Sequence, residues 1–423
     1  MPQHNRWAIA AAGVVMQVAL GAVYAWSVFR IPLTRAFGWT ISEVTLTFTI
    51  AIFVLGLAAF GGGLWMRRVG PRTVALTAGA LYGAGVGLAS LAGGRLWWLY
   101  CSYGLIAGVG LGLGYIVPVA TLVKWFPDKR GLITGLAVAG FGAGALITAP
   151  VATHLIASVG VLRTFAILGA AYFVAVTGGA LFMRNPPDGY QPPSAWDGLK
   201  DARDGLKAVP YRMKVVGNGL QAVPSSTLGA ALRSWQWYAL WTLLFLNTTA
   251  GIAVISQAAP MFQEITHITA ARAASVVGVI SIANGAGRLL WAWLSDVIGR
   301  RPVFFAMFVV QAIVFWILPS AHSLTLFAAL TVLVLLCYGG GFGTMPAFAA
   351  DYFGAEHVGS IYGLMLTAWG VAGILGPTLM AALRERSGGY DGALRLIAAL
   401  MLVSAVIPLL VRPPKAADVA RPF

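Results

Sequence analysis

The amino-acid sequence predicts an all-α membrane protein with twelve transmembrane helices in two pseudo-symmetric six-helix bundles. Of its 423 residues, 59% are hydrophobic and only 10% are charged, whereas charged residues make up about 25% of a soluble domain. Apolar runs recur along the whole chain, each close to the ~20 residues that cross the hydrocarbon core of a bilayer as a helix. Glycine is abundant, with 52 residues, as is usual where transmembrane helices pack closely.

Twelve apolar runs are long enough to cross a bilayer. Residues 1–7 are too short and polar for a signal peptide with a cleavage site, so we count the first run as a span. The predicted spans cover residues 8–33, 42–66, 73–94, 96–123, 131–157, 163–183, 236–262, 272–295, 302–320, 324–349, 358–383 and 392–411.

One long polar stretch, rich in Pro, Gly and charge, begins at Asn185 and separates the first six spans from the last six. This composition is typical of a linker between domains. We therefore expect an N-terminal six-helix bundle at 1–184, a cytoplasmic linker at 185–233 and a C-terminal six-helix bundle at 234–423.

The two halves repeat each other in sequence. A shift of 228 residues superposes Pro118 on Pro346 and Gly142 on Gly370, and further Pro and Gly pairs follow in register. Because an even number of spans separates the copies, we expect both halves to have the same orientation. Parallel six-helix repeats around a central axis are a transporter architecture in which the substrate binds at the midplane between the halves.

The distribution of charge predicts the orientation of the chain. Most of the 28 Lys and Arg fall in loops and tails on the side of the N-terminus, and such an excess marks the cytoplasmic side. We expect a monomeric, multi-pass protein of the cell inner membrane, embedded in the lipid bilayer with both termini in the cytoplasm. The loop near Arg384, Arg386 and Arg395 is basic on the outer side, against this trend. The net charge of +15 would also fit a patch for nucleic acid or lipid headgroups, but its distribution favours no nucleic-acid partner.

An arginine, Arg288, lies in the middle of a predicted span with no acidic residue within seven positions on either side. An arginine at the bilayer centre costs about 2.5–3.5 kcal/mol on insertion scales. Asp296, at the end of the span, is eight residues or ~12 Å away along a helix, so Arg288 cannot easily extend to the surface. In a water-accessible cavity, however, its guanidinium suits a carboxylate because it can bind two oxygens. Asn284, four residues earlier on the same face, adds an amide group.

The alternative for Arg288 is a scaffold role, in which backbone carbonyls of a broken helix satisfy its donors. Ionisable residues inside spans are by default functional, which favours the ligand-binding interpretation.

Two copies of one loop motif carry a family resemblance. AWLSDVIGRR at 292–301 and GLWMRRVGPR at 63–72 are similar to the motif G-x-x-x-D-R-x-G-R-R of the major facilitator superfamily. The resemblance implies that fold and a latch between the halves on the cytoplasmic side. Arg67 replaces the acid in the first copy, so this latch is expected only in the second; a plain glycine turn with cytoplasmic arginines is the alternative. The matching residues are Asp296, Gly299, Arg300 and Arg301 in the second copy and Gly63, Gly70 and Arg72 in the first.

A more specific resemblance lies in WFPDKRGLITGLAVAGFGAG at 125–144 and GSIYGLMLTAWGVAGILGP at 359–377. Both stretches are similar to the oxalate/formate antiporter group and the monocarboxylate transporters. In that group an arginine on helix 8, at the place of Arg288, binds the substrate carboxylate. Oxalate exchangers also carry a lysine in the helix 11 stretch, where this chain has Thr-Ala-Trp-Gly around Trp369. Since a dianion needs two cationic partners, we expect a monocarboxylate such as lactate, pyruvate or glycolate.

The resemblance also implies which side chains line the cavity, because helices 1, 4, 7 and 10 of this superfamily face the pore. Phe141 and Trp369 correspond under the 228-residue shift and are expected to form opposite walls. Aromatic walls with a few hydroxyls suit a short organic anion, although ordinary packed aromatics are the alternative for each. The further candidates for substrate binding are Tyr24, Tyr115, Gln257, Tyr338 and Phe342.

The sequence does not favour an enzyme, a metal or a cofactor. The five histidines fall in tails, loops or span ends, and no span has a carboxylate near its centre. The glycine-rich run GVGLGLGY at 108–115 is not GxGxxG and opens no strand–helix unit, and no Walker A lysine is present. Its glycines instead form two small-xxx-small faces for helix packing.

We therefore expect a secondary transporter that works by alternating access. The substrate carboxylate would neutralise Arg288, whereas the empty carrier would have to close around a bare charge. This is a reason for coupling transport to a proton or to a returning anion. The resemblance implies proton-coupled symport, with Glu43 and His154 as candidates for the titrating group. Anion exchange of the oxalate/formate type is the alternative, and a receptor that binds its ligand without moving it is a third.

Overall fold

The computed structural model describes residues 5–187, 190 and 226–414, which form helices joined by short turns and contain no strand. The predicted linker at 185–233 lies mostly outside the described residues. Its final part forms the short helix α9 (Leu228–Arg233), which Thr227 caps by accepting a hydrogen bond from the Ala230 amide.

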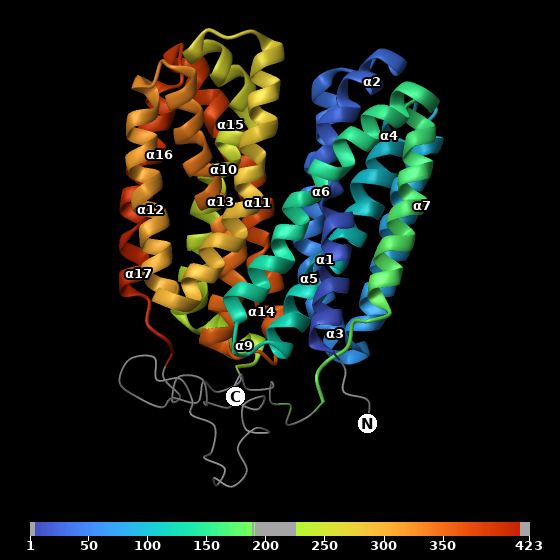
Figure 1. Ribbon diagram of the computed structural model, residues 1–423, viewed down its shortest axis with the longest axis vertical. Coiled ribbons are helices and arrows are strands. Elements are labelled where there is room, and N and C mark those ends of the chain that lie inside the picture. Colours follow the sequence, from blue (N-terminus) through green and yellow to red (C-terminus); the bar gives the residue numbers. More distant parts are fainter. Residues whose placement is uncertain (1–4, 188–189, 191–225, 415–423) are drawn as a thin grey trace, which may run out of the picture.

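The first half of the chain forms six membrane-length helical rods, several of which change helix type along their length (Figure 1). Its elements are α1 (Arg6–Gly21), η1 (Ala22–Trp26), α2 (Ser27–Phe37), α3 (Ile41–Leu88), η2 (Ala89–Leu91), α4 (Leu96–Leu99), η3 (Tyr100–Ala107), α5 (Gly108–Trp125), α6 (Arg130–Val159) and α7 (Val161–Ala180).

The second half is built in the same way. Its elements after α9 are α10 (Trp235–Thr266), α11 (Ala270–Ile298), α12 (Arg300–Ile317), η4 (Leu318–Ser320), α13 (Leu324–Phe353), α14 (Val358–Met365), α15 (Thr367–Ser387), α16 (Asp391–Ser404) and α17 (Val406–Leu410).

The described residues agree with twelve spans. Ten helical stretches are long and apolar enough to cross a membrane. One of them, Ser42–Leu91, is 50 residues long and reverses at Gly70, whose φ of 82° and ψ of 165° are not helical. A side chain would strain this backbone conformation, which glycine tolerates, so the stretch contains two spans. α11 is 29 residues long and supplies the twelfth.

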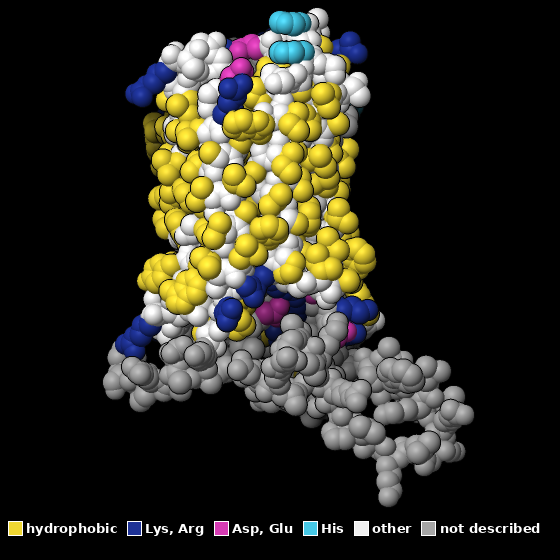
Figure 2. All heavy atoms as spheres, turned by 90° about the vertical axis from the view of Figure 1, so that its left-hand side faces the viewer, with side chains coloured by type: hydrophobic (Ala, Val, Ile, Leu, Met, Phe, Trp, Pro, Cys, Tyr) yellow, Lys and Arg dark blue, Asp and Glu magenta, His cyan; other side chains and the backbone are white. Residues whose placement is uncertain are grey.

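The surface confirms that the molecule is built for lipid. Large hydrophobic side chains face outward along its whole length, such as Val403 at 71%, Val174 at 67% and Trp316 at 63% exposure. Figure 2 shows them as a continuous band, with charged side chains gathered at the two ends of the molecule. A soluble monomer seldom exposes an apolar surface of this size.

The helices of each half pack mainly on one another, and a smaller set meets across the two halves. α6 contacts α11 and α13, and α3 contacts α14 and α15. The turn between α5 and α6, the end of α7 and the start of α9 lie at one end of the molecule, which we name the linker end (Figure 1). The two groups of helices approach each other there and diverge toward the opposite, far end.

Candidate functional site

Arg288 is fully buried, at 0% exposure, in the middle of α11. Its Nη1 donates to the backbone carbonyl of Val138 on α6 at 3.1 Å. Its two other hydrogen bonds are long: Nε to Asn284 Oδ1 at 3.4 Å and Nη2 to the Tyr24 hydroxyl at 3.5 Å. Among the described residues, no Asp or Glu forms an ion pair with it. A guanidinium has five N–H donors, so this group is under-satisfied for a buried cation.

Close helix packing brings α11 to the interface between the halves. A Cβ added to Gly343 of α13 would lie 2.0 Å from the Arg288 carbonyl oxygen, and one added to Gly339 would lie 2.0 Å from that of Asn284. On the other side of α11, a Cβ added to Gly135 of α6 would lie 2.7 Å from the Arg288 carbonyl oxygen. Glycine is therefore required for α13 and α6 to approach α11 this closely, which places Arg288 between the two halves.

Aromatic side chains from both halves surround Arg288. The guanidinium carbon lies 5.1 Å from the Phe342 ring, 5.9 Å from the Phe141 ring and 6.0 Å from the Tyr24 ring. At such distances the ring faces attract the cation. Tyr24 belongs to η1 and Phe141 to α6 of the first half, whereas Phe342 belongs to α13 of the second. The cation therefore contacts both halves of the molecule.

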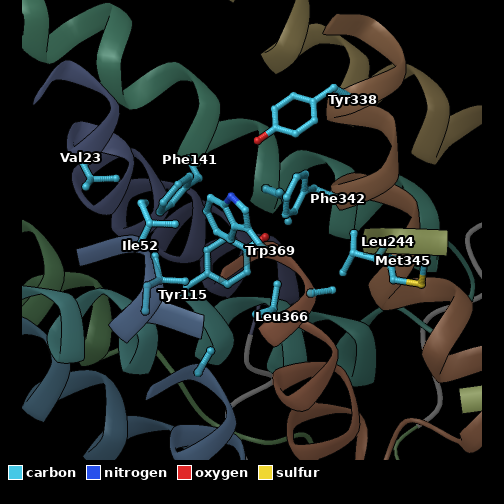
Figure 3. Packing of buried hydrophobic residues seen from close by; sticks show 14 of the residues in the cluster. Val23, Ile52, Tyr115, Phe141, Leu244, Tyr338, Phe342, Met345, Leu366 and Trp369 are labelled. Atoms are coloured by element: carbon cyan, nitrogen blue, oxygen red, sulfur yellow. The ribbon is translucent and has the colours of Figure 1, made fainter. Parts of the chain in front are cut away.

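Trp369 of α15 closes this cluster of rings. Its ring centroid lies 4.9 Å from that of Phe342, 6.0 Å from Phe141 and 6.0 Å from Tyr115. Figure 3 shows Phe141, Tyr115, Trp369 and Phe342 grouped where helices of the two halves meet. Phe141 and Trp369, which correspond in the internal repeat, are thus in direct ring contact rather than separated by an open cavity.

Two predicted site residues need separate placement. Tyr338 is 1% exposed and lies beside Phe342, with their ring centroids 5.4 Å apart. Gln257 is not part of this group, because its side-chain oxygen accepts a hydrogen bond from the Tyr390 hydroxyl at 3.5 Å near the far end. Of the nine residues predicted to bind substrate, the structure brings together all except Gln257.

Asp296 links the halves at the linker end. Its two carboxylate oxygens accept hydrogen bonds from the backbone amides of Gly131 at 2.9 Å and Leu132 at 2.8 Å, at the start of α6. A carboxylate there satisfies amides that have no partner within the helix and interacts favourably with the helix dipole. Asp296 also pairs with Arg300 of its own half at 2.7 Å.

Arg300 continues this set of contacts. Its Nε pairs with Asp351 at the end of α13 at 2.9 Å, and Asp351 also pairs with Arg130 at the start of α6 at 2.9 Å. A chain of charges therefore runs from the first half into the second. Arg301 points elsewhere and donates to the Pro408 carbonyl at 2.8 Å. Gly299 ends α11 with a φ of 96°, in the same way that Gly70 reverses α3.

The first copy of the motif forms a different interface. Gly63 lets α3 approach α14 closely, because an added Cβ would lie 2.1 Å from the Gly359 carbonyl oxygen. Arg72 donates to the Leu181 carbonyl at 2.5 Å within its own half. Arg67, which replaces the acid, is exposed. No carboxylate of the described first-copy residues therefore repeats the role of Asp296.

Sequence reasoning missed several contacts between the halves. Thr134 of α6 is fully buried and donates to the Gly343 carbonyl of α13 at 2.8 Å. The hydroxyls of Tyr115 and Tyr362 lie 3.5 Å apart across the interface. Opposite charges at neighbouring span ends, Arg130 and Asp351, were the one signal in the sequence for an ion pair. A threonine inside a span carries no such signal.

No group of three or more His, Cys, Asp or Glu that could hold a metal occurs in the described parts of the chain.

Comparison with protein families gives one match that spans the chain. The sequence model of the family described as Major Facilitator Superfamily matches residues 11–284 and 240–423. The two matches overlap and together cover both halves.

Several curated proteins are similar over most of their length. An uncharacterized MFS-type transporter of Escherichia coli, YhjX, is 29% identical over 374 residues, which cover 88% of this chain and 87% of that protein. The oxalate:formate antiporter of Oxalobacter formigenes is 26% identical over 421 residues, covering 97% and 94%. The apicoplast pyruvate carrier 1 of Toxoplasma gondii is 28% identical over 389 residues, covering 82% and 70%.

Solved structures show the same fold at low sequence identity. The transporter FucP in the outward conformation superposes with a TM-score of 0.70 at 16% identity, covering 95% of this chain and 97% of that one. The proton:xylose symporter XylE gives a TM-score of 0.68 at 13% identity, covering 95% and 94%.

Proposed function

This chain belongs to the major facilitator superfamily, and we propose that it is a secondary active transporter of small monocarboxylates, such as lactate or pyruvate, that works by alternating access. The observation that carries the proposal is Arg288, a fully buried cation between the two halves that pairs with no described carboxylate. Burying a charge without a partner is costly, and a visiting carboxylate removes that cost.

The chemistry around Arg288 favours a short, partly apolar anion. One ordinary hydrogen bond to the Val138 carbonyl and two long ones leave guanidinium donors free for two carboxylate oxygens. The surrounding rings supply apolar walls for a short carbon chain. The scaffold role, with carbonyls as the only partners, explains one of these contacts and leaves the other donors without strong partners.

A monocarboxylate is favoured over a dicarboxylate by the number of cations. Arg288 is the one cationic side chain among the described residues of the aromatic cluster, and a dianion would keep an uncompensated charge in a site of low dielectric. Relatives named as an oxalate:formate antiporter, a pyruvate carrier and a probable sulfoacetate transporter all concern small acid anions. These names support small acid anions as the substrate class. Because oxalate and sulfoacetate are dianions, the preference for a monocarboxylate rests on the single cation.

The latch at the linker end supports alternating access. Asp296, Arg130 and Asp351 join the halves by contacts that must break for this end to open. Their side chains are 21–34% exposed, so water can replace the lost hydrogen bonds. We propose that binding of the anion at Arg288 neutralises the buried charge. The two halves can then move between a conformation closed at the linker end and one closed at the far end.

The coupling partner in this proposal is a proton, with anion exchange as the second candidate. Glu43 caps α3 through hydrogen bonds from the Thr40 amide at 2.8 Å and hydroxyl at 2.9 Å, which is a structural task. His154 is exposed. No described acid contacts Arg288. Exchange needs no titrating group, because a second anion would neutralise Arg288 while the carrier returns. This observation favours anion exchange as the second candidate.

The proposal includes the setting of the protein. We place it in the cell inner membrane as a monomer, with the linker end and both termini in the cytoplasm, a first bundle at 1–184, a linker at 185–233 and a second bundle at 234–423. The basic loop at the opposite end is compatible with this orientation, because Arg384 there is paired with Glu264. In this proposal the protein contains no resident cofactor and does no covalent chemistry.

Uptake by purified protein in lipid vesicles tests the function. We expect accumulation of radiolabelled lactate or pyruvate when a pH step, acid outside, is applied, and little uptake of oxalate. Accumulation that requires formate or another anion inside, and ignores the pH step, would assign exchange. Saturable binding in detergent without any flux in vesicles would assign a receptor and contradict transport.

A further inference from the structure

One buried donor in the ring cluster around Arg288 has no partner among the described residues. Trp369 is 1% exposed, and its indole nitrogen Nε1 forms no hydrogen bond with any described group. A buried donor without a partner keeps the full cost of leaving water, and most such groups in folded proteins are paired. The location of this one therefore indicates what pairs with it.

Trp369 and Arg288 share the same aromatic neighbours. The Trp369 ring centroid lies 4.9 Å from Phe342, 6.0 Å from Phe141 and 6.2 Å from Tyr24. The Arg288 guanidinium contacts these same three rings. In Figure 3 the nitrogen-bearing edge of Trp369 points into the space between Phe141 and Phe342, toward the hydroxyl of Tyr338. The free N–H and the free guanidinium donors therefore belong to side chains that border the same three rings.

We propose that Trp369 donates a hydrogen bond to an oxygen on carbon 2 of the substrate, so that the site takes 2-hydroxy and 2-oxo acids in preference to unsubstituted monocarboxylates. This inference rests on the proposed function, because it requires the carboxylate to bind Arg288. In such acids the second oxygen lies on the carbon next to the carboxylate, so two donors that border the same rings can bind both groups at once. An unsubstituted acid of the same length leaves the indole unpaired.

The strength of this selection follows from the burial of the donor. A site built to hydrogen-bond a substrate oxygen rejects the analogue that lacks it, because the site is then left with an unpaired polar group. A single neutral hydrogen bond of this kind changes an equilibrium constant by about ten-fold. Phe342 and Phe141 have no polar group, so they contribute apolar contact to both kinds of acid and do not distinguish them.

The chain offers a matched control for the indole. Trp291 also has a buried indole nitrogen without a described partner. Its ring lies within the second half, against Gly340 of α13. Trp291→Phe and Trp369→Phe each remove one N–H and keep an aromatic ring, so the pair separates loss of a buried donor in general from loss of this donor.

The test compares L-lactate with propionate, and glycolate with acetate, as competitors of pyruvate uptake in vesicles and as ligands of the detergent-purified protein. Each pair differs by the oxygen on carbon 2. In the wild type we expect lactate and glycolate to bind about ten-fold more tightly than their partners. In Trp369→Phe this ratio should fall to near one through weaker binding of the oxygenated acids, whereas Trp291→Phe should keep the wild-type ratio.

Three results overturn the inference. Equal affinity of the wild type for the two members of each pair contradicts it without any variant, and leaves monocarboxylate transport intact if both acids are taken up. A preserved ratio in Trp369→Phe, or its loss in Trp291→Phe as well, also contradicts the assignment to Trp369. Failure of the wild type to bind any of the four acids would instead refute the proposed function itself.

Discussion

The centre of the molecule and its linker end both place arginines between the two halves, but they satisfy them differently. At the linker end, Arg300 pairs with Asp296 and Asp351, and their side chains keep some contact with water. At the centre, Arg288 is fully buried and pairs with no described carboxylate. Charges that satisfy one another stabilise one arrangement of the helices, whereas a buried charge without a counter-ion is suited to binding a ligand.

The two regions also differ in what transport requires of them. The ion pairs at the linker end must break in each cycle, whereas Arg288 must remain available to bind the substrate. Partly exposed ion pairs contribute about 0.2–1 kcal/mol each, so the linker end can open at small cost. The environment of Arg288 is buried and aromatic, and there a charge without a counter-ion is much more costly. We expect substitutions at the centre to abolish function and substitutions at the linker end to shift the balance between conformations.

The largest effect is expected for Arg288→Lys. Lysine keeps the charge but cannot bind two carboxylate oxygens in the planar geometry of a guanidinium. Loss of roughly 3 kcal/mol of charge-assisted hydrogen bonding lowers kcat/KM for uptake by about 100-fold. The control is Arg386→Lys, which changes an exposed arginine and should transport normally. Near-normal uptake by the Arg288 variant would contradict the assignment of Arg288 as the group that binds the substrate carboxylate.

An intermediate effect is expected for Asp296→Asn. The amide keeps one acceptor for the start of α6 but loses the charge, and with it the ion pair to Arg300. We expect about a ten-fold shift from the state closed at the linker end toward the open one, from a loss of about 1.5 kcal/mol. Ser360→Cys changes a buried residue of α14 that packs on Gly63 of α3 between the halves, and it would report opening of the linker end by faster maleimide labelling in a Cys101→Ser background.

Arg67→Asn is the matched control for that experiment, because Arg67 holds the equivalent position in the first copy of the motif. It is exposed and lies at an interface closed by glycine packing rather than by a carboxylate. Labelling should change little. Equal acceleration by both substitutions would show that the two interfaces are held by the same kind of contact.

The smallest effect concerns His357, in the turn before α14 at the linker end. Burial lowers the pKa of its imidazole below the ordinary value, and the nearby Arg67 and Lys124 lower this pKa further, against the opposing effect of Glu356. A lowered histidine pKa means that the unfolded chain binds the proton more readily. Stability is therefore complete above the ordinary pKa near 6.5 and is lost as the pH falls below it.

We expect the melting temperature of the wild type to fall between pH 7.5 and pH 5.5 by roughly one to two degrees more than that of His357→Gln. Scanning unfolding of both proteins in detergent measures this difference. An identical pH dependence in the two proteins would show that the burial of His357 and the nearby Arg67 and Lys124 do not oppose its protonation.

Much of the architecture could be predicted from the residues alone. Hydropathy predicted the spans because lipid demands apolar helices of one length, and Gly70 and Gly299 were recognisable as turns. The position of Arg288 was informative because a charge inside a span has few explanations. Asp296 and Arg300 were predicted as a latch by motif, and the structure adds the amides of Gly131 and Leu132 as the groups that Asp296 contacts.

The sequence by itself determined the twelve apolar spans, the internal repeat and the isolated buried cation, because each depends on local composition and spacing along the chain. Only the tertiary structure decided which rings meet at Arg288, that Gln257 lies with Tyr390 instead, and that the Trp369 indole lacks a partner in the described parts of the chain. Such contacts depend on the rotation and crossing of helices far apart in the chain. Those are set by close packing at glycines such as Gly343, which hydropathy does not encode.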